Sequence, residues 1–520
     1  MSKELKPQRE AWGTRIGLVL AMAGNATGLG NYLRFPVQAA QNGGGAFMIP
    51  YFCALLFLAV PLMWCEWAMG RMGGEKGHGT TPGIFNLLWK HPIAKYIGAI
   101  GVLLPIGVGI YYVYVQSWTL AYTFFAILGK YAGMASKEGM SAFLSNFHGV
   151  DTEWGVSTTA YFFFLITTAI NTIILMGGIQ KGVERVANWG MPILIFLSIM
   201  LVIRVLTLGA PDPSQPENNV WNGMGFIWNP DFSQLANAKV WLAAAGQIFF
   251  TLSVGFGMIQ VYASYMRSKD DIVVNGLSTT MVNEWGEVLL GGTIAIPIAY
   301  AFFGPIGTVE VAQGGSFNLG FATMPLVLER LPMSIVCGTS WFFLLFIAGT
   351  LSQIALVYPG ITFLQDELKW SRKKAVSVVC GLVFLAAHIP VLGLRNGALD
   401  EIDFWAGTFG VSLFALMEVL IFVWIFKPKN AWKEINKGAQ VNAPKIFLWV
   451  LKYVTPVYLA ALFVAWAIQQ GPDVLFMKGV SGNAALWRWA ARLLLLGIFA
   501  VLVWLISRAW KTQDVKEAML

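Results

Sequence analysis

The stretch GTRIGLVLAMAGNATGLGNYLRFPVQ, from Gly13 to Gln38, decides how this chain folds. Its 26 residues are long enough to cross a membrane, yet its middle reads GNATGLGN, with three glycines and two asparagines between Gly24 and Asn31. At bilayer depth no water satisfies freed backbone groups, so such a break survives only where protein or a polar cavity replaces the water. The alternative is a kinked packing helix with small residues at a neighbour contact. The density of glycine and asparagine favours a broken helix at a binding site.

Composition places the whole chain in a membrane. Of the 520 residues 57% are apolar and only 12% are charged, and the mean hydropathy is +0.63. Apolar runs near 20 residues recur along the sequence and predict twelve spans, at 13–38, 43–70, 92–125, 158–177, 189–208, 240–265, 275–302, 334–363, 374–393, 404–426, 445–468 and 486–507. The first run follows a charged segment and precedes no A-x-A cleavage pattern, so it predicts a retained span rather than a signal peptide.

Basic residues alternate regularly between the loops. They gather before span 1 and in every second loop after it, namely at Lys3, Lys6, Arg9, Arg15, Arg71, Lys76, Lys90, Lys95, Lys181, Arg185, Arg267, Lys269, Lys369, Arg372, Lys373, Lys374, Lys427, Lys429, Lys433 and Lys437. Because Lys and Arg accumulate on the cytoplasmic side, both termini are predicted to lie inside, in a multi-pass protein of the cell's inner (plasma) membrane. The net charge of +8 is thereby explained by topology, and nucleic acid is not an expected partner.

The residues that enzymes use for chemistry are scattered. The four cysteines all fall within apolar spans and have no metal-ligand spacing, and the four histidines form no cluster. The sequence shows no nucleophile triad and no phosphate-binding loop. An enzyme or a nucleotide-driven pump is therefore not expected.

A second break lies in span 6. The run from Gln247 to Gly257 places Thr251 and Ser253 beside Gly255-Phe256-Gly257. Spans 1 and 6 hold the same rank if the first ten spans form two five-helix halves, which is the pattern of an inverted repeat and indicates a transporter. The positive ends of half-helices would then face a carboxylate, and freed carbonyls would face an ammonium group or a sodium ion.

Other polar residues lie within the spans, where each is costly unless it has a partner. The candidates are Glu66, Asn283, Glu287, Ser352 and Glu418. Asn283 and Glu287 are four residues apart and share one helical face, which favours a functional role. For Glu66 and Glu418 a structural carboxylate, bonded to backbone near a helix break, is an equal alternative.

At this point the sequence resembles a known family closely. The motifs AMAGNATGLGN (21–31), LRFP (33–36), NGGGAF (42–47), GQIFFTLS (246–253) and DFWAGT (403–408) are similar to those of the neurotransmitter:sodium symporters, most of all to its bacterial leucine-transporter members. The resemblance covers nearly the whole chain in colinear order. It implies an all-α membrane protein of twelve helices, with an inverted five-plus-five repeat, broken helices 1 and 6, and sodium-coupled uptake of an amino acid by alternating access.

The resemblance also implies where an amino acid would bind. Its carboxylate would meet the amides of Leu29 and Gly30 and the hydroxyl of Tyr112, and its ammonium group would meet carbonyls in both breaks. The substrate-binding residues implied are Asn25, Ala26, Leu29, Gly30, Val108, Tyr112, Phe250, Thr251, Ser253, Phe256, Ser352 and Leu356. This set is apolar around the side chain and has no fixed charge, so a hydrophobic neutral amino acid fits best.

Two sodium sites follow from the same resemblance, with sodium ions as the only cofactors. The first would use Ala26, Asn31, Thr251, Asn283 and the substrate's own carboxylate, which links the affinities for ion and amino acid. The second would use Gly24, Thr27, Ala348, Leu351 and Ser352, and here the chain departs from the family because Leu351 stands where a hydroxyl is expected. One hypothesis is that the Thr27 hydroxyl compensates. The alternatives are a water-filled site and an absent one.

Gates and an anion position complete the resemblance. Arg34 and Asp403 correspond to the outer gate across a vestibule, above an aromatic lid of Phe250 and Tyr112. Arg9, Tyr265 and Asp366 correspond to the inner network, with Trp12 packing the inner plug. Glu287 stands where chloride-dependent relatives carry a hydroxyl, so its carboxylate would substitute for chloride.

These features predict a domain order of a cytoplasmic N-terminal segment (1–12), a first repeat (13–208), a second repeat with extracellular loops (209–427), helices 11 and 12 (428–507), and a cytoplasmic tail (508–520). The expected function is sodium-coupled, chloride-independent import of hydrophobic neutral amino acids, with membrane lipids as partners and further copies of the chain as candidate partners. Two alternatives are a proton- or single-sodium-coupled transporter and a nontransporting amino-acid sensor on the same fold.

Overall fold

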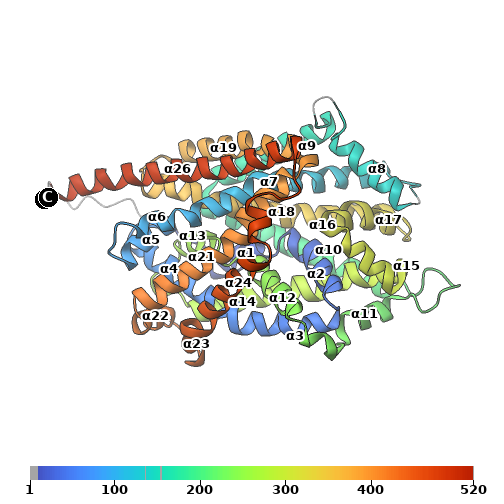
Figure 1. Ribbon diagram of the computed structural model, residues 1–520, viewed down its shortest axis with the longest axis horizontal. Helices are drawn as coiled ribbons and strands as arrows, with labels where there is room; N and C mark the ends of the chain where they lie inside the picture. The colour runs from blue at the N-terminus through green and yellow to red at the C-terminus, as the bar shows by residue number, and fades with distance from the viewer. Residues whose placement is uncertain (1–9, 135, 153–154, 519–520) are drawn as a thin grey trace.

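Apolar helices make up almost all of the computed structural model, which describes residues 10–134, 136–152 and 155–518 (Figure 1). In these residues ten helical stretches are long and apolar enough to cross a membrane. They are α3–η2–α4 (Gly45–Glu75), α6–α7 (Ala94–Ile127), α9 (Thr158–Met176), η3–α10 (Ile179–Leu206), α14–η5–α15 (Ile272–Gln313), α18 (Ser334–Asp366), α19 (Arg372–Leu392), α20–η8–α21–η9 (Ala398–Ile425), α23–η10–α24 (Ile446–Gln469) and the greater part of α26 (Gly482–Ala518).

Spans 1 and 6 are broken, as the sequence predicts. In span 1, α1 (Arg15–Ala26) ends at the GNATGLGN motif, and the chain resumes as the π-helix η1 (Gly30–Arg34) and α2 (Phe35–Gln41). In span 6, α12 (Ala238–Thr251) and α13 (Met258–Ala263) are separated by residues 252–257, which are not helical. Together with the ten long helical stretches, of which α15 is kinked at Gly304, these two segments agree with the twelve predicted spans in the described part of the chain.

The final helix continues beyond the predicted last span. α26 runs to Ala518, so the segment predicted as a cytoplasmic tail, 508–520, is helical as far as the structure describes it. The sequence from Arg508 to Ala518 has no glycine or proline to stop a helix, whereas the prediction ended the span where the apolar residues end.

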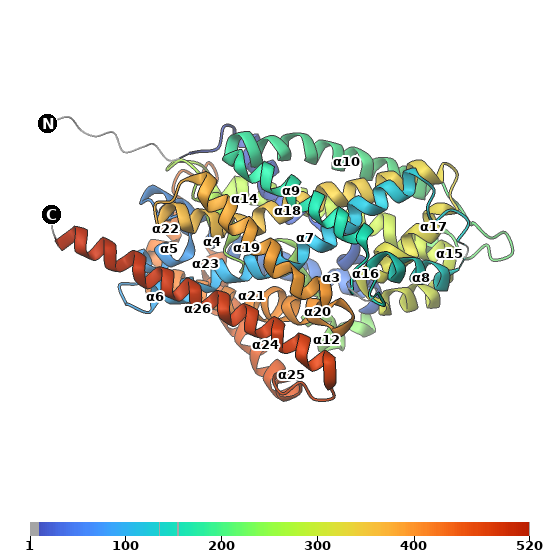
Figure 2. The ribbon, with the colours of Figure 1, turned by 90° about the horizontal axis from the view of Figure 1, so that it is seen from above.

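Short helices connect the spans at the two ends of the molecule. At one end lie α5 (Thr81–Leu88), α6 and α22 (Pro428–Ile435), and at the other lie α8 (Lys137–His148) and α17 (Met324–Glu329), as both ribbon views show (Figures 1 and 2). The remaining short elements are α11 (Val220–Trp228), η4 (Phe232–Ala236), α16 (Gly315–Asn318), η6 (Leu319–Thr323), η7 (Leu394–Asn396) and α25 (Gly471–Leu475). The lysine- and arginine-rich loops after spans 2 and 10 thus share one end of the molecule.

Glycine is required in the span 6 break by backbone contact. Gly255 and Gly257 have φ angles of +79° and +88°, which residues with a side chain rarely adopt. A Cβ on Gly257 would stand 2.1 Å from the Gly101 carbonyl oxygen of α7, and one on Gly255 would stand 2.7 Å from the Val411 carbonyl oxygen of α21 (Gly410–Val419). The break is therefore held directly against the backbones of spans 3 and 10.

We expect Gly257→Ala to destabilise the fold strongly. The left-handed backbone alone costs an alanine about 1–2 kcal/mol, and the contact with Gly101 adds to that cost. The measurement is the midpoint of thermal unfolding of the purified protein in detergent. The matched control is Gly246→Ala in α12, where a Cβ would meet nothing within 4 Å. Equal midpoints for the two variants would show that spans 3 and 6 do not approach as described.

Candidate functional site

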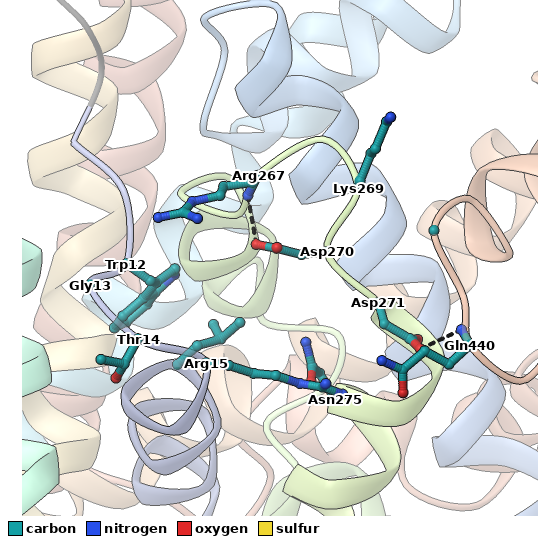
Figure 3. Close-up of a pocket in the computed structure, with 12 residues that line it drawn as sticks. Trp12, Gly13, Thr14, Arg15, Arg267, Lys269, Asp270, Asp271, Asn275 and Gln440 are labelled. Atoms are coloured by element: carbon teal, nitrogen blue, oxygen red, sulfur yellow. Dashed lines mark hydrogen bonds between the residues drawn. The ribbon is translucent and has the colours of Figure 1, made fainter.

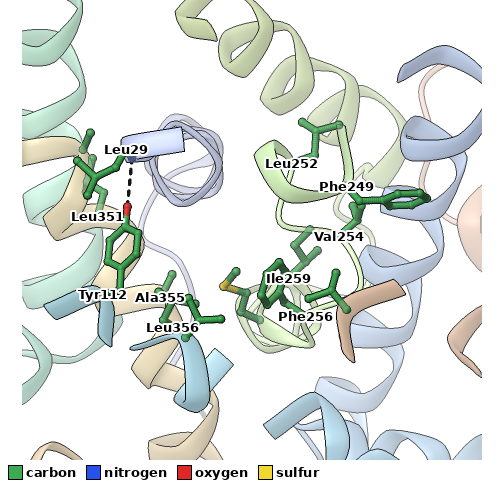
Figure 4. Packing of buried hydrophobic residues seen from close by; sticks show 14 of the residues in the cluster. Leu29, Tyr112, Phe249, Leu252, Val254, Phe256, Ile259, Leu351, Ala355 and Leu356 are labelled. Carbon is green, nitrogen blue, oxygen red and sulfur yellow. Dashed lines mark hydrogen bonds between the residues drawn. The ribbon is translucent and has the colours of Figure 1, made fainter. Parts of the chain in front are cut away.

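A central pocket lies where the two breaks face each other. It is lined by Asn25, Ala26, Gly28, Gly30, Val108, Tyr112, Phe250, Thr251, Ser253, Phe256, Met258, Ser352 and Leu356. Figure 4 shows Tyr112 and Leu356 on one side of this space and Phe256 on the other. Every residue that the resemblance assigns to amino-acid binding is on this list except Leu29, which contributes its backbone.

The polar part of the pocket is made of backbone groups of span 1. The Leu29 N–H donates to the Tyr112 hydroxyl at 3.1 Å, and the Ser352 hydroxyl donates to the Asn25 carbonyl at 3.1 Å. The Asn25 Oδ1 atom is buried and has no hydrogen-bond partner. A Cβ on Gly28 would stand only 2.6 Å from the Ser352 hydroxyl, so a residue without a side chain is needed there. This end of the pocket offers donors and acceptors and no charged side chain.

Met258 was missed by the sequence analysis. It is the first residue of α13, directly after the Gly-Phe-Gly turn, and it is 3% exposed. Its position directly after the break was the available signal, because residues beside the non-helical segment line the pocket. With Val108, Phe250, Phe256 and Leu356 it makes the rest of the pocket apolar.

The side chains predicted for the first sodium site form one buried cluster beside the pocket. The Asn31 Nδ2 group donates to Asn283 Oδ1 at 2.9 Å, and Asn283 Nδ2 donates to the Thr251 hydroxyl at 3.1 Å. Thr251 and Ala26, the remaining residues of the set, also line the pocket. Amide, hydroxyl and carbonyl oxygens are ligands that hard cations prefer, so these residues fit a sodium ion.

Two carboxylates border this cluster on span 7. Glu287 accepts hydrogen bonds from the Thr251 hydroxyl and from Gln247 Nε2, the latter at 2.8 Å. Glu284, which the sequence analysis did not single out, accepts from the Tyr51 hydroxyl at 2.7 Å and from Asn283 at 3.2 Å. Both glutamates are buried. The spacing of three residues between them, which puts both on one helical face, was the signal for Glu284.

Only part of the set predicted for a second sodium site is brought together. Gly24 of span 1 lies against Leu351 of α18, and Ser352 of α18 bonds the Asn25 carbonyl, whereas the Thr27 side chain lies against Gly286 of span 7. The Leu351 Cδ1 atom lies 2.8 Å from the point where a Cβ on Gly24 would stand. Hydrocarbon therefore occupies the position at which the resemblance implies a hydroxyl.

An outer vestibule of about 330 Å³ lies above the pocket. Its lining includes Arg34 and Asp403, the predicted outer gate, and it shares Gly30, Tyr112 and Phe250 with the central pocket. Phe250 and Tyr112 thus separate the two spaces, as expected of a lid.

The predicted Arg34–Asp403 pair is not formed in this structure, although both side chains are described. The Arg34 guanidinium lies over the Phe250 ring, 4.2 Å from its centre, and Asp403 accepts a hydrogen bond from the Tyr111 hydroxyl instead. Both side chains line the vestibule without forming an ion pair with each other.

The inner side is closed by the start of the described chain. The Trp12 indole N–H donates to the Tyr262 carbonyl at 2.9 Å, and the two rings meet edge to face at 5.6 Å. Tyr265 is buried against Thr362, and Asp366 accepts from the Gly79 N–H at 2.8 Å. Arg9, the third predicted member of the inner network, lies outside the described residues.

A polar hollow of about 280 Å³ borders Trp12 on this inner face (Figure 3). Arg15 bonds Asn275 there at 2.6 Å, and the Asp271 side chain accepts from the Gln440 N–H at 2.7 Å. The hollow shares no lining residue with the central pocket, in agreement with a closed inner gate.

Comparison with known proteins decides the family. The family model described as the sodium:neurotransmitter symporter family matches residues 9–138 and 135–511. The chain belongs to this family. It is therefore a multi-pass membrane protein from a family of sodium-dependent transporters, and that family is not a class of enzymes.

Individual relatives agree with this assignment. This chain is 31% identical to an uncharacterised sodium-dependent transporter of Methanocaldococcus jannaschii, over 88% of this chain and 90% of that protein. It is 23% identical to sodium-dependent nutrient amino acid transporter 1 of Drosophila persimilis, over 94% of this chain and 79% of that one. Among solved structures, MhsT in complex with L-phenylalanine superposes with a TM-score of 0.76 at 26% identity, covering 88% of this chain and 100% of MhsT.

Proposed function

We propose that this symporter imports hydrophobic neutral amino acids together with sodium, without chloride, by alternating access. We further propose that it works in the inner (plasma) membrane with both termini in the cytoplasm. The observation that carries the proposal is the central pocket, which has bare backbone groups at one end, apolar side chains at the other, and the Asn31–Thr251–Asn283 cluster directly beside it.

The pocket chemistry supports an amino acid with an apolar side chain. The span 1 amides and the Tyr112 hydroxyl suit a carboxylate, and the unpartnered Asn25 Oδ1 suits an ammonium group. A charged side chain would lose its hydration among Val108, Phe256 and Leu356 without gaining a partner. The complex of MhsT with L-phenylalanine and the Drosophila nutrient amino acid transporter agree with this class of substrate.

Shared residues support coupling between ion and amino acid. Thr251 lines the pocket and also hydrogen-bonds Asn283, and Ala26 belongs to both sets. A bound sodium ion would supply positive charge next to the substrate carboxylate. Because each ligand then favours the other, their affinities are linked reciprocally.

The two gates support alternating access. The outer vestibule reaches Phe250 and Tyr112, whereas Trp12 packs on Tyr262 at the inner side. The reverse state requires Arg34 and Asp403 to approach and the Trp12–Tyr262 contact to break. Such contacts are modest in strength and solvated when open, which permits a cycle.

The central test is binding of the twenty standard amino acids to the purified protein, with and without sodium. We expect binding of neutral aliphatic and aromatic amino acids that depends on sodium, and no binding of lysine or aspartate. Uptake of the best ligand into proteoliposomes against its gradient then distinguishes a transporter from a sensor on the same fold. Binding that is indifferent to sodium, or a preference for a charged amino acid, contradicts the proposal.

Tyr112→Phe should weaken binding of that amino acid by about 2- to 12-fold, the usual effect of losing one hydrogen bond. The measurement is equilibrium binding at saturating sodium. Tyr114→Phe is the matched control, because the Tyr114 hydroxyl on the same helix is buried without a partner. If both variants bind equally well, the Tyr112 hydroxyl does not contact the ligand.

Glu287→Ser should make uptake depend on chloride. The substitution replaces a buried carboxylate that accepts from Gln247 and Thr251 with a hydroxyl, so an external anion is needed to restore the negative charge. Uptake is measured in chloride and in gluconate. Glu287→Asp keeps the charge and should remain indifferent to chloride. Uptake by the serine variant at the same rate in both anions would reject this role for Glu287.

A further inference from the structure

The groove between spans 1, 5 and 8 is filled with apolar side chains where relatives are expected to hold a second cation. The Leu351 Cδ1 and Cβ atoms lie 2.8 and 3.4 Å from the point where a Cβ on Gly24 would stand, and the Met191 sulfur of span 5 lies 3.3 Å from it. Leu351 is 2% exposed and Met191 is 1% exposed. The face of Gly24 on which a side chain would stand is thus covered by hydrocarbon and a thioether.

The nearby hydroxyl groups are engaged elsewhere. Ser352 donates to the Asn25 carbonyl and lines the amino-acid pocket. Thr350, next to Leu351 in sequence, accepts from Gln116 Nε2 at 2.8 Å and donates to the Phe346 carbonyl at 2.7 Å. Thr350 is therefore held on the side of α18 that faces span 3.

Thr27 is the remaining candidate for a compensating oxygen. Its hydroxyl is buried and has no hydrogen-bond partner. Its side chain, however, lies against span 7, with Cγ2 3.1 Å and Oγ1 3.6 Å from the point where a Cβ on Gly286 would stand. The methyl group is thus the part of Thr27 that lies nearest to Gly286 of span 7, and neither Thr27 atom is among the three nearest neighbours of the Gly24 Cβ position, which are two Leu351 atoms and one Met191 atom.

These side chains do not fit a sodium ion. A hard cation prefers oxygen ligands, and a thioether is a soft one. Removing an ion from water without replacing its ligands is strongly unfavourable. The isobutyl group of Leu351 both removes one ligand and fills the space in which an ion would be solvated.

We infer that Leu351 replaces the second cation with apolar packing, and that each amino acid is coupled to a single sodium ion at the Asn31–Thr251–Asn283 cluster. The inference deepens the proposed function and rests on it for the coupling, but the number of bound ions is measurable without transport. Leu351 and Met191 hold span 1 against spans 5 and 8 whether or not sodium is present.

The first test counts sodium ions. Isotopic sodium binding to the purified full-length protein, at saturating amino acid, should give one ion per chain. Leu351→Thr supplies an oxygen and should give two, whereas Leu351→Val has nearly the same size as threonine without the oxygen and should give one. Two ions in the unaltered protein overturn the inference, and one ion in Leu351→Thr overturns the role of Leu351.

Thermal unfolding of each variant at several sodium concentrations provides a second readout. A single ion predicts that stabilisation grows with the logarithm of sodium concentration at the slope of one bound ion, and Leu351→Thr should double that slope. Thr27→Val should leave both the count and the slope unchanged. Two ions in the unaltered protein that fall to one in Thr27→Val would instead show that the Thr27 hydroxyl compensates for Leu351.

Flux provides the third readout and separates the two proposals. In proteoliposomes at zero membrane potential and equal pH, a tenfold sodium gradient should be balanced by an amino-acid gradient of about tenfold for one ion and about a hundredfold for two. Balance near a hundredfold overturns single-ion coupling. Absence of sodium-driven uptake, together with one bound ion, contradicts the proposed transport but agrees with the loss of the second site.

Discussion

Backbone groups freed in the middle of a membrane must find partners, and this constraint organises the whole molecule. At the span 6 break the Gly255 N–H donates to the Glu66 carboxylate of span 2 at 2.5 Å. At the span 1 break the Leu29 N–H meets the Tyr112 hydroxyl of span 3, and the Gly28 N–H donates to Asn31 Oδ1 at 2.9 Å. Each break is thereby tied to a continuous neighbouring helix. The same groups that make the breaks suited to a zwitterion require the surrounding bundle to stabilise them.

The breaks themselves were predictable from the sequence, because glycine and asparagine destabilise an apolar membrane helix. Several of them together therefore indicate a structural or binding role. The GNATGLGN and Gly-Phe-Gly segments identified spans 1 and 6 as the broken ones. The family motifs then indicated which positions line the pocket. Glu66 shows where single-residue reasoning stops. The sequence left a structural and a functional role equally open, and its bond to Gly255 shows the structural one.

The features that could not be predicted depend on which way a side chain points. Thr350 and Leu351 are neighbours in sequence, and only the bond from Gln116 to Thr350 shows that this hydroxyl faces span 3. Glu284 accepts a hydrogen bond from Tyr51, which belongs to another span and lies more than two hundred positions away in the sequence. Arg34 and Asp403 have other partners in this structure, Phe250 and Tyr111, and a sequence specifies the residues of a gate but not its state.

Leu351 affects how sodium binding shifts the equilibrium between the outward-facing and inward-facing conformations. A cation held between spans 1 and 8 would make their contact conditional on the ion, because the oxygen ligands repel one another without it. Apolar packing of Leu351 on Gly24 is independent of sodium, so this contact contributes equally in either ionic condition. A ligand shifts an equilibrium only by its differential affinity for the two states. If each amino acid is coupled to one sodium ion as proposed, the sodium dependence of the cycle arises at the Asn31–Thr251–Asn283 cluster. Coupling is then a property of one contiguous site.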